Sequence, residues 1–327
     1  MAVAADLVPV TVVTGGAEAS LLVHRMRLGL ADDPIGVLSG NAGAAADDIH
    51  EWLRLQPVEG SRSSGCACCR VRLDLVEGLR LLVDRRARPE RVIVLLDALD
   101  DLSTALQTLL SDPDLQRLVE LDGVIQTVDA VALSTRVRLG LPFGAQPELE
   151  RLAIADRVLV VRGDELVDEA LHSVMVGLRT VAGFGLTAVP SIWPVAVKEL
   201  VGLNAWHGAP AVQPRIVFAP VVVEHGCERP DTVYCEVDGE LDPDAVEEWL
   251  DEIVAVNASR ILRLQGAVRV AGQEFRVCLR GVRSFATSHS ELMHPVDQRS
   301  TRSIVAVAGY GLDAAAIRSG FDATALR

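Results

Sequence analysis

The chain has 327 residues, enough for about two domains of ordinary size. Half of the residues are hydrophobic and 23% are charged, which is the profile of a folded globular protein rather than a disordered one. The net charge of -14 argues against broad, non-specific binding to nucleic acid or to an anionic membrane surface, since both need a basic face.

The amino-terminal segment shows none of the features of a targeting signal. It lacks a positively charged region, and Asp6 and Pro9 interrupt its apolar stretch. No apolar run approaches the roughly 18 residues that a membrane span needs. Without a secretory context, the six cysteines are expected to be thiols rather than a disulfide framework. These observations predict a cytoplasmic protein that does not enter the membrane.

In the first two thirds of the chain, short runs rich in β-branched residues alternate with segments of helical periodicity. The runs predict buried strands and the periodic segments predict helices, one of which has Asp101 or Ser103 as its cap. Strands that alternate with helices imply crossover connections and a mostly parallel sheet. The predicted strands are 8–15, 33–40, 91–98, 122–133 and 156–164, and the predicted helices are 19–30, 74–87 and 101–112.

The pattern changes after residue 205. The next segment is rich in proline and has no helical period, which predicts a linker. Beyond it, a small α+β domain on an antiparallel sheet is expected, with a helix that begins near Asp242 and Pro243. A hairpin is expected to turn at Ala271-Gly272-Gln273, with 274–288 as one continuous strand, and a last strand and a closing helix follow. The predicted domains are 1–205 and 228–327, joined by the linker 206–227.

Three of the six cysteines stand within four positions, in SSGCACCRVRLDL (residues 63–75). Cys66 and Cys68 can point the same way in an extended segment, and a turn at residues 68 and 69 would bring in the sulfur of Cys69. Three thiolates suit a soft or borderline cation such as zinc. Arg70 and Arg72, with the amino terminus of the following helix, would favour deprotonated sulfur.

The sequence leaves the fourth ligand of such a site open. Water, a buffer molecule, His24, His50 or Glu51 could supply it, and an open position would suit exchange or sensing rather than permanent structure. The same cysteines are also compatible with a redox switch, in which one low-pKa thiol pairs with a resolving partner. A third interpretation is that they are small apolar residues beneath a turn.

The other three cysteines have no spacing typical of metal ligands. Cys235 and Cys278 fall in strand-like stretches, where a small buried hydrophobe is expected. Cys227 ends the sequence EHGC, a weak candidate for a metal cluster that is more simply explained as a loop.

Several motifs, in this order and over nearly the whole chain, resemble the CobW-like metallochaperone branch of the P-loop GTPases. SGCACCRVRLDLVEGLRLL is similar to that family's GCxCC segment and its following helix, and AIADRVLVVRGDELV to its ADRVLLTKTDLV stretch. QTLLSDPDLQRLVELDGVIQTVDAV is similar to its QTLL…LDGVVTVVDA stretch, and the last hundred residues resemble its C-terminal domain. The resemblance implies an α/β fold, with a mostly parallel P-loop-NTPase-like sheet flanked by helices and then a small α+β domain. It also implies handling of zinc, or of cobalt, and a protein client.

The phosphate-binding loop departs from this family. In GxxxxGK[ST], backbone N–H groups cradle the phosphates, the lysine neutralises them and the hydroxyl binds magnesium. Where the family reads TGFLGAGKTTLLNH, this chain reads TGGAEASLLVH (residues 14–24), which is three residues shorter and offers Glu18 to a phosphate. Ser20 is expected to be a helix amino-terminal residue rather than a magnesium ligand. The single lysine of the chain is Lys198, far along the sequence.

Other nucleotide features are weakened as well. The family's ETSGLADP is LLDALDDL here, in which Asp97 could still hold magnesium, and its NEFGE segment is GNAGA, residues 40–44. The base-recognition motif TKTD is VRGD, which retains Asp164, an acceptor for guanine. Ser20, Asp97 and Asp164 are therefore only vestigial candidates for nucleotide binding, and neither GTP with Mg²⁺ nor GTP hydrolysis is expected.

The preferred hypothesis is a zinc-binding CobW-like protein that has lost GTPase activity and conveys zinc occupancy to a protein partner. By analogy with divergent relatives, one such role is to couple zinc starvation to ribosome remodelling or hibernation through a ribosome-associated factor. One alternative is a zinc or cobalt metallochaperone with residual GTP binding through Asp97 and Asp164. The other is a thiol redox sensor that uses Cys66, Cys68 and Cys69.

Overall fold

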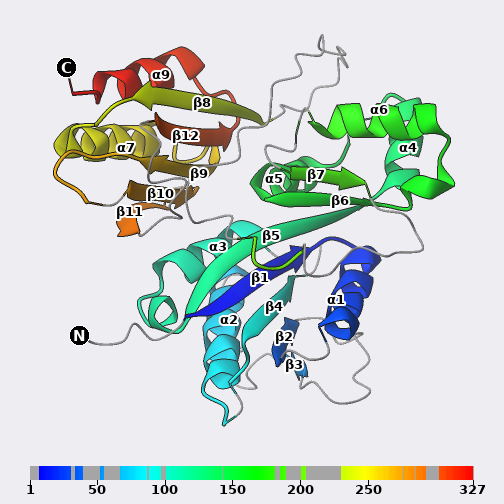
Figure 1. Cartoon of the computed structure of the whole chain (residues 1–327). Coiled ribbons are helices and arrows are strands. Elements are labelled where there is room, and N and C mark those ends of the chain that lie inside the picture. The colour runs from blue at the N-terminus through cyan, green and yellow to red at the C-terminus, as the bar shows by residue number, and fades with distance from the viewer. Residues whose placement is uncertain are drawn as a thin grey trace. The chain divides into compact units, whose positions relative to one another are not determined.

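The computed structural model of the chain forms two compact units, which are described separately below (Figure 1). The first consists of Met1–Ala130, Arg157–Glu165 and Thr187–Asn204, and the second of Val131–Asp156, Leu166–Leu186 and Ala205–Arg327. The predicted linker, 206–227, lies outside the described residues. The structure describes residues 7–30, 34–39, 52–54, 67–86, 88–96, 101–141, 143–179, 181, 185–188, 200–203, 230–274, 276–283, 285–291 and 302–326.

Within the described residues, a seven-stranded sheet has the order β3-β2-β4-β1-β5-β6-β7. Neighbouring strands from β3 to β6 are parallel, which confirms the predicted α/β fold. The runs that predicted strands form β1, β2, β4, β5 and β6, whereas β3 and β7 were not predicted. The strands are β1 (Val8–Thr14), β2 (Ile35–Ser39), β3 (Trp52–Arg54), β4 (Arg91–Leu96), β5 (Val119–Asp129), β6 (Arg157–Val161) and β7 (Gly185–Ala188).

Two predicted strands end earlier than expected. The strand predicted to reach residue 133 stops at Asp129, and helix α4 (Ala130–Arg138) begins at the next residue. The strand predicted to reach residue 164 stops at Val161, and a 3₁₀ turn, η2 (Gly163–Glu165), follows. After β5 the apolar run continues as AVAL, so that hydrophobicity alone does not mark the change of backbone conformation. After β6 the residues RGD are not apolar, and the predicted strand extended too far into them.

Helices cover both faces of the parallel sheet. Helix α1 (Ala17–Gly29) packs Leu22 and Met26 into a buried cluster with Ile93 of β4. Leu82 of α2 (Ala67–Val83) lies beside Gly36 of β2 and Val92 of β4. Because neighbouring residues of a strand face opposite sides, Val92 and Ile93 place α2 and α1 on opposite faces. Helix α3 (Leu102–Ser111) packs against α2.

The start of α3 agrees with one of the two predicted caps. The Asp101 carboxylate accepts a hydrogen bond from the Thr104 backbone N–H at 3.2 Å, which satisfies one of the free donors at the helix start. Asp101 is therefore the cap, and Ser103 is buried within the first turn. The short turn η1 (Leu115–Arg117) then leads into β5.

A buried aspartate ties residues 200–203 to the parallel sheet. Asp122 of β5 is 2% exposed, and its Oδ2 atom accepts hydrogen bonds from the Thr11 hydroxyl at 2.9 Å and from the Gly202 N–H at 3.0 Å. Arg91 Nη1 lies 3.6 Å from the same oxygen. Leu203 packs directly against Gly123, where an added Cβ would lie 2.7 Å from Leu203 Cδ1. These contacts fix the described segment at the end of the first unit.

The second unit contains three helices from the middle of the chain and a sheet from its last third. The three helices are α4, α5 (Gln146–Ile154) and α6 (Asp168–Arg179). Among the described residues, the sheet has five antiparallel strands in the order β11-β10-β9-β12-β8. The strands are β8 (Asp231–Asp238), β9 (Ile261–Val268), β10 (Arg276–Val282), β11 (Phe285–Glu291) and β12 (Arg302–Gly309).

The segment predicted as one strand at 274–288 is instead a tight hairpin. Val282 of β10 pairs with Phe285 of β11, and Arg283 at the turn adopts the left-handed conformation with φ 58°. The prediction of one strand was wrong because the turn residue is Arg283 rather than a glycine that would mark a turn. The other hairpin, between β9 and β10, turns where it was predicted, with Gly272 at φ 76°.

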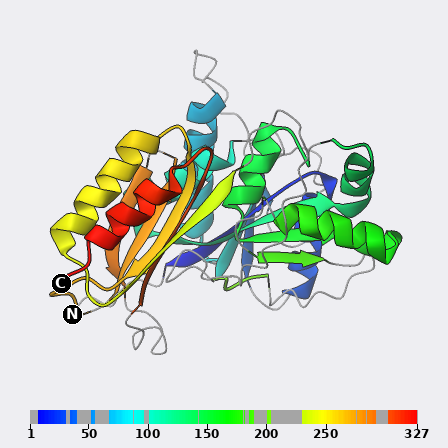
Figure 2. The same ribbon diagram turned by 90° about the horizontal axis from the view of Figure 1, so that it is seen from above.

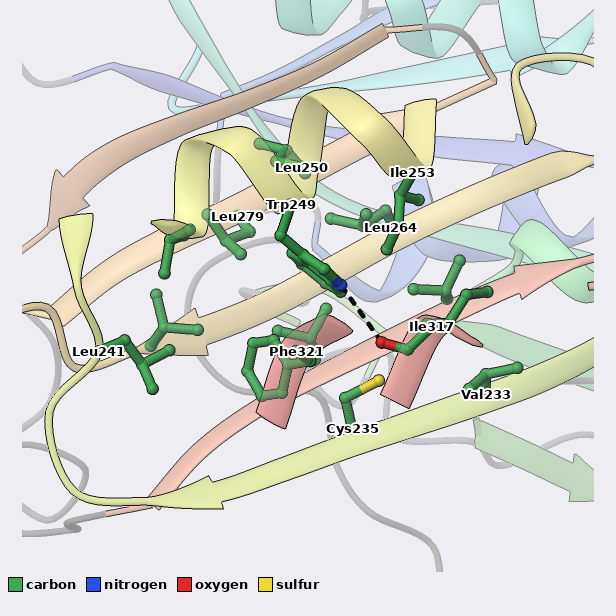
Figure 3. Close-up of a cluster of buried hydrophobic side chains, with 14 of the residues drawn as sticks. Val233, Cys235, Leu241, Trp249, Leu250, Ile253, Leu264, Leu279, Ile317 and Phe321 are labelled. Carbon is green, nitrogen blue, oxygen red and sulfur yellow. Dashed lines mark hydrogen bonds between the residues drawn. The ribbon is translucent and has the colours of Figure 1, made fainter. Parts of the chain in front are cut away.

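Two helices cover one face of the five-stranded sheet, as Figure 2 shows. Helix α7 (Pro243–Asn257) begins as predicted, because Asp242 Oδ1 accepts a hydrogen bond from Ala245 N–H at 3.0 Å. Trp249 of α7 and Phe321 of α9 (Ala314–Ala323) form the centre of the core, with ring centroids 4.9 Å apart (Figure 3). The Trp249 indole donates to the Ile317 carbonyl at 3.2 Å, so its polar atom is satisfied within the apolar cluster.

Candidate functional site

The sequence motifs of interest meet the structure at the carboxyl edge of the parallel sheet. The loops after β1 and β6 leave this edge and carry Gly15 and Arg162, and β5 ends at this edge with Asp129. In open parallel sheets this edge is where ligands bind, because it gathers loops and helix amino termini from several strands. Candidate nucleotide and metal sites are therefore expected among the residues at this edge.

The connection between β1 and α1 is too short to wrap a phosphate. Strand β1 ends at Thr14 and α1 begins at Ala17, so that only Gly15 and Gly16 separate them. Gly15 has φ 142°, and a Cβ placed there would clash with the side chain of Thr127 on β5. The Ala19 N–H already bonds the Gly16 carbonyl at 3.1 Å. The loop is thus closed against the sheet, and Glu18 in the first turn of α1 adds a negative charge.

Arg162 stabilises the turn after β6 through hydrogen bonds to two carboxylates. Its Nη1 donates to Asp129 Oδ2 at 2.7 Å, while Nε and Nη2 donate to the two carboxylate oxygens of Glu165 at 2.9 and 2.7 Å. The backbone of Arg162 is left-handed, with φ 61°. The hydrogen bonds that Arg162 donates to Glu165, together with the charge of Asp129, raise the pKa of the Arg162 guanidinium above its usual value. The guanidinium is therefore engaged within the protein.

The three vestigial nucleotide residues do not form one described site. Ser20 is the fourth residue of α1 and is half-buried, as expected for a helix amino-terminal residue. Asp164 is exposed in the turn η2, after β6. Strand β5 lies between β1 and β6, so the two strands that lead to these residues are about 10 Å apart. Asp97 lies outside the described residues.

The cysteine motif lies at the start of α2. This helix begins at Ala67, earlier than the predicted residue 74, so that the backbone of Cys68 and Cys69 is helical. The predicted turn at these two residues is therefore wrong. Cys66 lies outside the described residues, as do the side chains of Cys68 and Cys69.

The direction of α2 places this motif at the carboxyl edge of the sheet. Leu82, near the end of α2, lies beside Gly36 and Val92, each the second residue of its strand. The end of the helix is therefore at the amino edge. A helix of 17 residues is about 25 Å long, so its first turn points toward the opposite edge. Free N–H groups of that turn favour negative charge, including thiolate sulfur.

One candidate for a fourth ligand can be placed. His24 is exposed on α1, which packs on the face of the sheet opposite to α2. The sheet thus separates His24 from the motif, whereas His50 and Glu51 lie outside the described residues. Among side chains that the structure does describe, no group of three His, Cys, Asp or Glu residues is arranged to hold a metal ion.

Comparison with known families decides the relationship. The model of the CobW/HypB/UreG nucleotide-binding domain matches residues 9–181, and that of the cobalamin synthesis protein CobW C-terminal domain matches residues 231–325. The chain belongs to the CobW family. The resemblance found in the sequence motifs is confirmed, although this CobW-family chain has the short β1–α1 connection described above.

Individual relatives of this CobW-family chain are distant but mostly of full length. A protein named zinc chaperone CobW from Sinorhizobium sp is 23% identical, over 97% of each chain. Zinc-regulated GTPase metalloprotein activator 1 from Schizosaccharomyces pombe is 23% identical over 52% of this chain and 42% of its own length. The crystal structure of the Zn(II)-bound YjiA GTPase from E. coli has a TM-score of 0.70 at 18% identity, covering 98% of this chain and 100% of that one. This structural likeness shows that the fold is shared.

Two cysteines of this CobW-family chain are buried in strands, as predicted. Cys235 on β8 and Cys278 on β10 are 2% and 1% exposed, and both are free thiols. In the portions of the chain with described structure, no helix is long and apolar enough to cross a membrane.

Cys235 should resist thiol reagents while this CobW-family protein is folded. Burial raises the pKa of its thiol to about 12, with a smaller opposing effect of Arg318, so the sulfur stays protonated at neutral pH. Because the folded pKa exceeds the ordinary value of about 9, its contribution to stability is constant below pH 9 and is lost as the pH rises toward 12. Alkylation followed by peptide mass spectrometry should find Cys235 modified only after denaturation. Rapid modification of the native protein at pH 8 would contradict this assignment.

The network around Arg162 was missed by the sequence analysis. VRGD resembles the base-recognition motif through its retained aspartate, and its arginine stands where that motif has a lysine. Glu165 follows Arg162 by three residues, a spacing that permits an ion pair, and this was an available signal. Asp129 gave no such signal, because its proximity to Arg162 depends on the pairing of β5 with β6.

Proposed function

We propose that this CobW-family protein binds one zinc ion through Cys66, Cys68 and Cys69 and has lost GTP hydrolysis. One observation carries the proposal: the edge of the sheet toward which the cysteine-bearing end of α2 points is also the edge at which the β1–α1 connection is closed. The residues at this edge therefore favour metal binding and do not favour nucleotide binding.

The chemistry of the motif supports zinc. Three thiolates fill most of a tetrahedral zinc shell and leave one position for an exchangeable ligand. The helical start at Ala67 puts Cys68 and Cys69 in the first turn of α2, where the helix dipole favours their deprotonated forms. Relatives named zinc chaperone and zinc-regulated activator add support for zinc, and cobalt is the second candidate, with a similar ligand preference.

The charge at the carboxyl edge argues against a nucleotide. Asp129, Asp164 and Glu165 surround Arg162, whose guanidinium already bonds two of these carboxylates. Glu18 stands at the start of α1, and no lysine occurs in this part of the sequence. At the described part of this edge, a nucleotide triphosphate would meet these carboxylates and a β1–α1 connection of only two residues.

The resulting role is a zinc-responsive adaptor whose occupancy is conveyed to a protein partner. A reducing compartment such as the cytoplasm would keep the three thiols available for metal. The partner would be a zinc client or, in the narrower hypothesis of zinc starvation, a ribosome-associated factor involved in hibernation. Two other candidates are a metallochaperone with residual GTP binding at Asp97 and Asp164, and a redox sensor that uses the same cysteines.

Metal analysis and nucleotide calorimetry on the reduced full chain test this proposal. We expect one zinc per chain, and no GTP binding tighter than about 1 mM in the presence of Mg²⁺, a free energy of about -4 kcal/mol. Micromolar GTP binding would favour the metallochaperone. A metal-free reduced chain that cannot be loaded with zinc or cobalt, and that forms a disulfide within 66–69 on mild oxidation, would favour the redox sensor.

A further inference from the structure

A fully buried arginine stands on the sheet face that α7 and α9 do not cover. Leu264 and Val268 of β9 belong to the core beneath those helices, so Arg263 and Gln265, which alternate with them, face the other side. The Arg263 side chain is 0% exposed. Its Nη1 donates to the Ile154 carbonyl at 2.6 Å, and its Nη2 contacts both the Asp156 carboxylate and the Gln265 side-chain oxygen.

The partners of Arg263 come from one short segment. Ile154 is the last residue of α5, and Asp156 is two residues further along, immediately before β6. Asp156 is itself buried, with a side chain 6% exposed. Arg263 therefore holds both the final carbonyl of a helix, which lacks an intrahelical partner, and the carboxylate that follows it.

A second arginine engages the same helix from the same sheet. Arg283, at the turn between β10 and β11, pairs with Glu150 of α5, and the two side chains are 27% and 17% exposed. Helix α5 packs on β9 and β12, and its own Leu149 and Leu152 are buried. The two ion pairs thus bind the middle and the end of α5 to one sheet.

Buried ion pairs of this kind fix the relative position of two segments but add little net stability to the fold. Removing both charges in favour of apolar residues of similar size is often neutral or stabilising, whereas removing one leaves an uncompensated charge. The pair is also specific, because a guanidinium that contacts three acceptors at once tolerates little displacement. Arg263 and Asp156 are 107 positions apart in the sequence, so the contact selects one arrangement of two remote segments.

We propose that Arg263 and Arg283 clamp α5 to the C-terminal sheet, so that α5 opens and closes with that sheet. The inference is independent of zinc binding, and its test uses metal-free protein.

Native-state hydrogen exchange of the full chain, reduced and with a chelator present, tests the clamp. In the wild type, amides of α5 and β9 should respond to low denaturant in parallel. Arg263→Met leaves Asp156 buried without its partner, and we expect α5 and β9 amides to exchange at least tenfold faster while those of β1 and β4 are unchanged. Combining it with Asp156→Leu should restore most of the protection.

Two further variants keep the test decisive. Arg269→Met removes an arginine whose pair with Glu240 is exposed at 44% and 47%, and it should leave all four elements unchanged. If Arg263→Met does not fold, Arg283→Met removes the half-buried pair and should speed exchange several-fold in α5 alone. The proposal is overturned if α5 exchange does not change in either clamp variant, or if it rises together with that of β1 and β4.

Discussion

Replacing Cys66, Cys68 and Cys69 together with serine should abolish zinc binding, and each single replacement should weaken it at least tenfold. Tenfold corresponds to about 1.4 kcal/mol per site. The reason is chemical, since serine presents a protonated oxygen where zinc requires a thiolate. Because the ligands must lose protons to bind, affinity of the wild type should also fall steeply as the pH drops below the thiol pKa range.

Competition with a chromophoric zinc chelator measures these affinities directly. Matched controls are Cys235→Ser and Cys278→Ser, which alter buried thiols of the second unit and should leave zinc affinity unchanged while lowering stability. If the wild type binds no zinc after reduction, or if the three single variants bind as tightly as the wild type, the cysteine site is wrong.

Replacing Asp122 with alanine should destabilise the first unit by about 3 kcal/mol. The change deprives the Thr11 hydroxyl, which is 0% exposed, and the Gly202 N–H of their acceptor, and it leaves Arg91 without its carboxylate. Asp122→Asn retains one acceptor oxygen, so its cost should be about half as large. The stability of the first unit should therefore increase from Asp122→Ala to Asp122→Asn to the wild type, because each retains more of the contacts made by the carboxylate.

The free energy of opening, measured by exchange of β1 and β5 amides, reports this effect. Asp114→Ala is the control, because its contact with Arg80 is between side chains 51% and 42% exposed and should contribute less than about 1 kcal/mol. The exchange of β9 amides should not change in either Asp122 variant. A loss below about 1 kcal/mol in Asp122→Ala would show that the buried carboxylate is not what fixes residues 200–203.

Features that depend on neighbouring residues could be predicted from the sequence. Asp101 and Asp242 cap helices because a carboxylate before a helix reaches the N–H groups two or three residues on, whatever the rest of the fold does. Gly272 marks a hairpin turn because glycine adopts positive φ without strain. The alternation of strands and helices gave the parallel sheet for a similar reason, since it requires crossover connections.

Features that depend on remote pairing could not be predicted. Arg263 lies in an apolar strand, and nothing near it in the sequence indicates that its partner is Asp156. The same holds for Asp129 and Arg162, which meet only because β5 and β6 are neighbours. The break between β10 and β11 was not marked in the sequence, since the residue that turns is an arginine rather than a glycine.

For the candidate site, the sequence predicted the short connection between β1 and α1 but not the backbone of the cysteine motif. The missing lysine and the shortened loop correctly indicated a connection unlike a P-loop, and the structure adds that Gly15 is packed against Thr127. The cysteines were expected in an extended segment and a turn, yet two of them begin a helix. That difference matters because the start of a helix leaves backbone N–H groups without intrahelical partners.

The two-residue connection between β1 and α1 also bears on how this lineage can change. A point substitution could supply a lysine, but no point substitution can lengthen the loop. At Gly15 any other residue would strain the backbone and collide with Thr127, so the position resists even neutral drift. A longer connection of the P-loop kind would need an insertion together with a change on β5, and neither is useful without the other. The short connection is therefore expected to persist among descendants of this chain, which are expected to diversify at the cysteine motif and at the residues around Arg162 instead.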